Sequence, residues 1–164
     1  MDGLRALTLM AATISMGLVA GVFGVFGHTI MPGLKKTDDR TFVGAFQSID
    51  RAIINPWFMG GGFLGALVFT AAAGVLNIGE DALPWILAAF VLYVATFVIT
   101  IAISVPLNDA IKAAGEPDRI PDLGAVRARF NESRWARWNL VRALASTTAF
   151  GCLAWALVVH GGST

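Results

Sequence analysis

Four long apolar runs separate the polar segments of the chain, at about residues 4–31, 56–76, 82–105 and 135–159. Each run reaches the roughly 20 residues that a helix needs to cross the hydrocarbon core of a bilayer. The first run is longer than the roughly 7–15 residues of the apolar core of a cleaved signal peptide, so we expect it to be retained. The pattern predicts an all-α fold: an integral membrane four-helix bundle in which residues 1–164 form a single membrane domain.

The two long connections between these runs each predict an amphipathic helix. Thr37 or Asp38 can cap a helix that reaches Ile54, and within it Phe42 and Phe46 recur at helical spacing. A second, basic helix is expected over residues 123–130, directly before the fourth run. The connections are therefore expected to pack against the bundle rather than to remain as loops.

Basic residues are distributed very unevenly along the chain. Of 12 Lys and Arg side chains, 11 lie in the two long connections or at the beginning of the fourth run, and Arg5 alone lies on the opposite side. Cytoplasmic loops of membrane proteins carry such an excess of positive charge. We therefore expect both connections to be cytoplasmic and both termini to lie outside, in a multi-pass protein of the plasma membrane.

The composition narrows the classes of function. Charged residues make up 14% of the chain and hydrophobic residues 56%, whereas a soluble domain carries about 25% charged residues. The 12 basic and 11 acidic side chains nearly cancel, so no overall field would attract a nucleic acid. The expected partners are membrane lipids and a lipophilic small molecule, and homo-oligomerisation is left open.

Metal ligands are scarce in the sequence. Cys152 is the single cysteine, and the two histidines, His28 and His160, lie near opposite faces of the predicted bilayer. They cannot share one ion. We therefore expect no metal site, with a haem held by His28 alone as the alternative. The sequence also shows no Gly-rich phosphate loop between a strand and a helix, so we expect no nucleotide cofactor.

Polar residues in each predicted span fall at steps of three or four and converge at one depth. They lie within about two helical turns, roughly 11 Å, of the cytoplasmic ends of the spans. Polar groups at such depth face the bundle interior or a water-filled cavity. The predicted pocket comprises His28, Asn55, Ser104, Asn108, Trp135, Asn139 and Arg142.

Structural explanations compete at each position. The glycines of the first span can form a close-packing seam, and hydroxyls such as Ser104 can bond back to helix carbonyls. Arg142 can reach toward lipid phosphates, and His28 can serve as a helix cap. If Arg142 is instead buried it needs acceptors, and the Asn side chains, Asp50 and Asp109 are the nearest candidates by topology.

The third run leads into Val105-Pro106-Leu107-Asn108-Asp109, which is followed by Phe130 and then by residues 134–142 with the pattern Arg-Trp-Ala-Arg-Trp-Asn-Leu-Val-Arg. This set of motifs resembles the anthrone oxygenase-like family of small four-span membrane proteins. Gly27-His28, Phe46 with Asp50-Arg51, and Asn55-Pro56 also look like that family's pattern. Many bacterial members of the family have no assigned activity.

The resemblance implies a monooxygenase of aromatic polyketide chemistry that converts an anthrone to an anthraquinone with O2, without metal or flavin. Acid–base chemistry then suggests the roles: His28 as the general base, because an imidazole titrates near neutrality, and Asn139 with Arg142 as donors that hold the oxyanion. Asn55, Asn108, Trp135 and Ser104 would bind the substrate.

Two other classes of function remain open on sequence grounds. The same pocket suits a non-enzymatic membrane protein that binds or transports a quinone, a lipid or another apolar molecule. A structural membrane subunit, docked through the basic helix 123–130, is the third class.

Overall fold

The computed structural model describes residues 1–162, and within them the chain is built from helices joined by short turns. In chain order the elements are α1 (Asp2–Val25), the π segment η1 (Phe26–Ile30), α2 (Met31–Leu34), α3 (Asp39–Ile53), the π segment η2 (Trp57–Leu64), α4 (Gly65–Leu76), α5 (Leu83–Ile99), the π segment η3 (Thr100–Ser104), α6 (Val105–Lys112), the 3-10 turn η4 (Pro117–Arg119), α7 (Leu123–Phe130) and α8 (Glu132–Gly162).

The described residues contain four helical stretches long and apolar enough to cross a membrane, namely Asp2–Leu34, Trp57–Leu76, Leu83–Lys112 and Leu123–Gly162. This confirms the predicted all-α fold with four spans. The amphipathic helices α3 and α7 also lie where the sequence placed them. In the last stretch α7 meets α8 at Asn131, which adopts the left-handed conformation with φ 54°.

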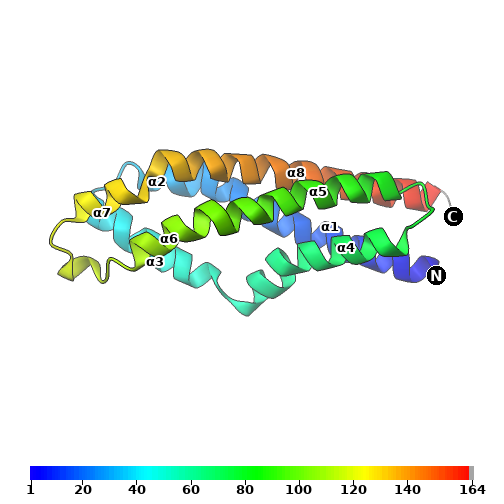
Figure 1. Cartoon of the computed structure of the whole chain (residues 1–164), viewed down its shortest axis with the longest axis horizontal. Helices are drawn as coiled ribbons and strands as arrows, with labels where there is room; N and C mark the ends of the chain where they lie inside the picture. The colour runs from blue at the N-terminus through cyan, green and yellow to red at the C-terminus, as the bar shows by residue number, and fades with distance from the viewer. Residues whose placement is uncertain (163–164) are drawn as a thin grey trace.

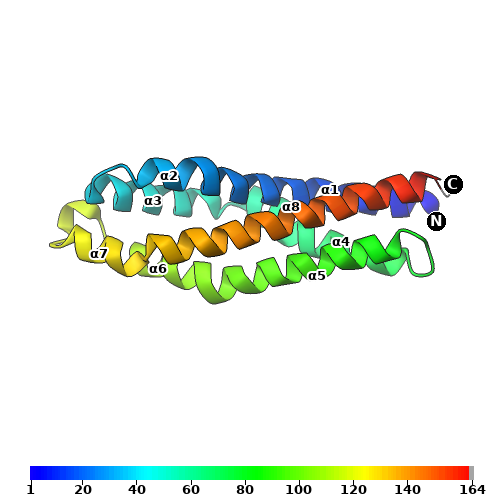
Figure 2. The same cartoon turned by 90° about the horizontal axis from the view of Figure 1, so that it is seen from above.

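Helices α1, α4, α5 and α8 run side by side as a long bundle, with both termini at one end and α3, α6 and α7 at the other (Figures 1 and 2). The membrane-spanning core is a continuous cluster of buried side chains that includes Met16, Ile86, Tyr93 and Leu153. A second cluster at the other end joins α3 to α7 and to the start of α8 through Phe42, Phe46, Phe130 and Trp135. The cavity described below lies beside this second cluster.

Two of the π segments stand at the same distance from a proline. Segments η1 and η3 end two residues before Pro32 and Pro106, respectively. A proline ring clashes with the carbonyl four residues earlier, here His28 and Ala102, and both of these lie within the π segments. The wider turn accommodates the ring while the helix continues.

Asp38, one of the two caps that the sequence allowed, caps the beginning of α3. Its Oδ1 accepts a hydrogen bond of 2.8 Å from the backbone N–H of Thr41, and this bond lowers the pKa of the Asp38 carboxyl. A lowered folded-state pKa means that the contribution to stability is present above the ordinary titration range of aspartate and is lost as the pH falls through the folded-state value. We expect Asp38→Ala to lower the midpoint of thermal unfolding in detergent at pH 7, with the difference from wild type closing on acidification. A difference independent of pH would contradict this account.

Candidate functional site

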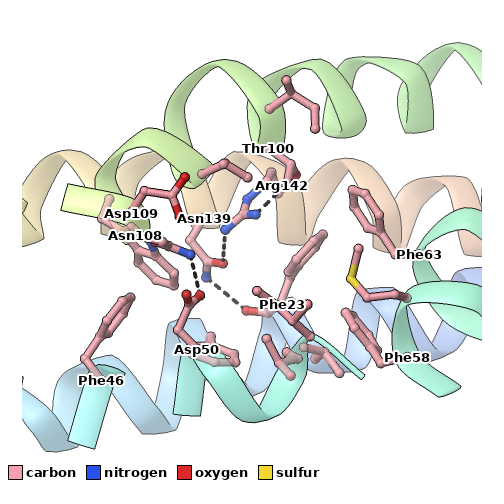
Figure 3. Close-up of a pocket in the computed structure, with 18 of the residues that line it drawn as sticks. Phe23, Phe46, Asp50, Phe58, Phe63, Thr100, Asn108, Asp109, Asn139 and Arg142 are labelled. Atoms are coloured by element: carbon pink, nitrogen blue, oxygen red, sulfur yellow. Dashed lines mark hydrogen bonds between the residues drawn. The ribbon is translucent and has the colours of Figure 1, made fainter. Parts of the chain in front are cut away.

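A cavity of about 200 Å³ lies between α1, α3, η2, η3, α6 and α8. This is far above the ~10–15 Å³ that a single buried water occupies, so the space is larger than a packing defect. Its apolar walls combine aliphatic side chains with six aromatic ones, Phe23, Phe26, Phe46, Phe58, Phe63 and Trp135. The polar side chains in its lining are Asp50, Thr100, Asn108, Asp109, Lys112, Asn139 and Arg142 (Figure 3).

Arg142 is a buried cation at this cavity, with 4% of its surface exposed. Its guanidinium donates to Thr100 Oγ1 at 3.2 Å and to Asn139 Oδ1 at 3.0 Å, and its Cζ lies 4.3 Å from the centre of the Phe23 ring. Within residues 1–162 no carboxylate lies within ion-pair distance of it, and its Nε has no hydrogen-bond partner. A buried arginine normally has a counter-charge, so this site is electrostatically incomplete.

Asn139 holds the guanidinium in place. It lies one helical turn before Arg142 on α8 and is completely buried. Its Nδ2 donates to the backbone carbonyl of Phe23 at 3.0 Å, which orients its Oδ1 toward Arg142. A Cβ at Gly27 would lie 3.3 Å from the same Nδ2, so a glycine there gives the amide room. The first and fourth spans are thereby joined at the depth of the cavity.

A second polar group lies closer to the connecting helices. Asp50, at the end of α3, is 7% exposed; its Oδ1 accepts a hydrogen bond of 2.6 Å from Asn108 and its Oδ2 pairs with Lys112 at 2.8 Å. Trp135 Nε1 donates to Asn108 Oδ1 at 2.8 Å. Lys112 also pairs with Asp109 at 3.1 Å. Helices α3, α6 and α8 therefore meet in one network at the cavity wall.

Exposed apolar side chains line one part of the cavity. Ile54, Ile101 and Val105 line it and are 58%, 53% and 37% exposed, respectively. Ile101 and Val105 belong to the third spanning stretch, so the surface they expose faces the hydrocarbon of the bilayer. We therefore expect a lipophilic molecule to reach the cavity from the lipid side, past these side chains.

The sequence profile of the family described as anthrone oxygenase matches residues 55–152, which is more than half of the chain. The chain belongs to the anthrone oxygenase family. No curated protein and no solved structure gives a significant match. The matched residues include the cavity-lining Thr100, Asn108, Trp135, Asn139 and Arg142, whereas Asp50 and His28 precede them.

Four of the predicted site residues lie together in this anthrone oxygenase family member: Asn108, Trp135, Asn139 and Arg142 all line the cavity. Asn55 and Ser104 do not. Asn55 caps the second span, accepting a hydrogen bond of 2.9 Å from the backbone N–H of Phe58. Ser104 is buried within η3 but lies outside the cavity lining.

The expected position of His28 is corrected by the structure. Its side chain is exposed, and its Nδ1 lies 2.6 Å from Thr29 Oγ1 rather than in the cavity. The buried face of α1 is apolar and runs through Met16, Val19 and Phe23. His28 follows within η1, where the wider turn no longer keeps the α-helical period, and it faces outward.

The acidic partners expected for Arg142 are also corrected, because Asp50 and Asp109 pair with Lys112 instead. Lys112 and Thr100 line the cavity although neither was predicted to lie at the site. A hydroxyl within a helix can bond back to a helix carbonyl, and Thr100 does donate to the carbonyl of Thr96 at 2.8 Å while accepting from Arg142. Lys112 was counted only with the basic connection.

No group of three or more His, Cys, Asp or Glu side chains within residues 1–162 is arranged to hold a metal ion. The positively charged side chains that line the cavity of this family member are Arg142 and Lys112. What the lining offers chemically is hydrogen-bond donors for an oxyanion, one buried carboxylate and a set of aromatic surfaces.

Proposed function

We propose that the protein is a membrane-embedded oxygenase, acting without a cofactor, that oxidises a planar lipophilic phenol or anthrone with O2 to a quinone. The observation that carries this proposal is Arg142, a buried cation without a carboxylate, in the wall of a largely apolar cavity with aromatic side chains. Such a cation stabilises negative charge that develops on a bound substrate. Membership of the anthrone oxygenase family supports an oxygenase-like reaction.

The chemistry of an anthrone suits this arrangement. Removal of a proton from the methylene group between its two aryl rings leaves an electron-rich anion with its charge on the ketone oxygen. One electron passes to O2, and the two radicals combine to a peroxide anion at the former methylene carbon. Protonation of the peroxide, loss of the second C–H proton and cleavage of the O–O bond give the quinone and one water. One oxygen atom of O2 enters the product and the other leaves as water.

The side chains of the cavity would also hold the oxyanion, contact the rings of the substrate and exclude water. Arg142 and Asn139 would hold the oxyanion, and Trp135 with Phe23 and Phe26 would contact the faces of a flat ring system. An aromatic lining keeps bulk water from the anion, which strengthens each polar contact. A substrate that dissolves in lipid would enter past the exposed apolar side chains.

We further propose the orientation in which α3, α6 and α7 lie in the cytoplasm and both termini outside, in the plasma membrane. The support is the excess of Lys and Arg at that end of the bundle. A reporter fused after the C-terminus that is active only in the cytoplasm would overturn this orientation.

Oxygen uptake by the purified protein tests the proposal. The full chain in lipid nanodiscs should consume O2 in the presence of anthrones, and with ¹⁸O₂ the quinone should gain one labelled atom. Mass spectrometry of the quinone detects this labelled atom, and a parallel reaction in H₂¹⁸O with unlabelled O2 shows whether the quinone takes oxygen from water instead. Tight binding of anthraquinones without O2 uptake across a panel of anthrones and hydroquinones would overturn the proposal and favour a binding or transport protein.

A further inference from the structure

We infer that Asp50 is the general base of this oxidation, the group that removes the proton from the carbon to be oxygenated. This inference rests on the proposed function. His28, which the sequence favoured for this role, is exposed outside the cavity. Two carboxylates line the cavity, and of these Asp109 has 62% of its side chain exposed while Asp50 is buried.

The Asp50 carboxylate is held in a defined orientation. Asn108 Nδ2 donates to Oδ1 at 2.6 Å, and Lys112 Nζ lies 2.8 Å from Oδ2. Asn108 is in turn fixed by Trp135 Nε1 at 2.8 Å. An ionised carboxylate has about four acceptor positions on its two oxygens, so these contacts leave positions at which a proton can be received.

Charged groups on two other helices surround Asp50 and the cavity that a substrate would fill. The charged groups that face it are Lys112 and Asp109 on α6 and, across the cavity, Arg142 on α8. Figure 3 shows Asp50 and Arg142 reaching the cavity from different helices. A substrate with its ketone oxygen at Arg142 and its acidic methylene toward α3 would place the proton at the base and the new charge at the cation. An aspartate can act as the base for such a carbon acid when strong donors hold the oxyanion.

The proton balance of the reaction needs a single base. Asp50 takes the first C–H proton, the electron pair of that bond remains on the substrate, and one of its electrons then reduces O2. The same carboxylic acid returns the proton to the peroxide anion that forms when the radicals combine. Asp50 then takes the second C–H proton as the O–O bond breaks, and gives it to the departing hydroxide. Both protons end in one water, and Asp50 is regenerated as a carboxylate.

Comparison of Asp50→Asn with wild type over a range of pH tests this role. At pH 7 the variant should oxidise an anthrone about 10²–10⁴-fold more slowly, the usual contribution of a general base. Its rate should then rise about tenfold per pH unit, because the substrate itself ionises at higher pH and no longer needs the base. The wild-type rate should vary far less over the same range. Anthraquinone affinity should be retained, which shows that the cavity is intact.

The controls separate this inference from the proposed function. Asp81→Asn removes an exposed carboxylate at the opposite end of the bundle and should leave the rate unchanged. If Asp50→Asn fails to fold because Lys112 loses its partner, the double variant Asp50→Asn/Lys112→Gln removes both charges and is measured in the same way. Turnover at the wild-type rate, or a slow rate that does not recover with pH, would overturn the role of Asp50. Absence of turnover by wild type would instead overturn the oxygenase proposal.

Discussion

Arg142→Lys should lower kcat/KM for anthrone oxidation about 10²–10³-fold, the loss typical of removing a donor that stabilises an oxyanion. The guanidinium reaches Thr100 and Asn139 with two different nitrogens and keeps its Nε without a protein partner. An ammonium group on a flexible stem cannot reproduce this planar fork. The charge is retained in the variant, so the experiment isolates geometry rather than net charge. Oxygen uptake and quinone absorbance provide the measurement.

Arg137→Lys is the matched control for this substitution. Arg137 lies on the same helix five residues earlier, and its side chain is exposed. The control should keep the wild-type rate, and both variants should keep the wild-type fold by circular dichroism. Equal activity of the two variants would remove Arg142 from the proposed mechanism.

Phe46→Ala should destabilise the protein by about 3–5 kcal/mol, the range for deleting a buried aromatic ring. Phe46 is 1% exposed, and its ring centre lies 4.5 Å from that of Phe130 and 5.8 Å from that of Trp135. The Phe46 ring thus packs α3 against α7 and α8 beside the cavity. Loss of it would also loosen the indole that donates to Asn108.

Chemical unfolding in a mild detergent, followed by tryptophan fluorescence, measures this effect. Phe69→Ala is the comparison, because Phe69 is 37% exposed on the lipid side of α4. Exposed apolar side chains gain little from contact with protein rather than lipid, so this variant should be close to wild type. A similar loss in both variants would mean that the Phe46 cluster does not hold the connecting helices in place.

The location of the cavity could be predicted where the helices are regular. Trp135, Asn139 and Arg142 lie at steps of four and three on α8, an uninterrupted α-helix, and all three reach the cavity. The lengths of the apolar runs were sufficient to predict the four spans. Asp38, one of the two residues expected to cap α3, accepts from a backbone N–H as its residue type suggests.

Two of the residues wrongly placed in the cavity, His28 and Ser104, share a cause. His28 belongs to η1 and Ser104 to η3, where the helix is wider and the step of four no longer returns to the same face. No simple residue pattern predicts where a π segment will interrupt an α-helix. Asp50 was considered only as a counter-charge for Arg142, because the pairing of Asp50 with Lys112 depends on how α3 packs on α6.

A π segment also separates two faces of one helix, a face that packs in the core and a face that lines the cavity. A π segment holds about one residue more per turn than an α-helix, so the helix beyond it is rotated by about 100°. On the third span, the face before η3 packs into the membrane core through Tyr93, while Asn108 beyond it belongs to the cavity. Because the two faces of this span point in different directions, substitutions beyond η3 that change the cavity need not change the packing of Tyr93. One such scaffold is therefore open to adaptation toward lipophilic substrates of different outline.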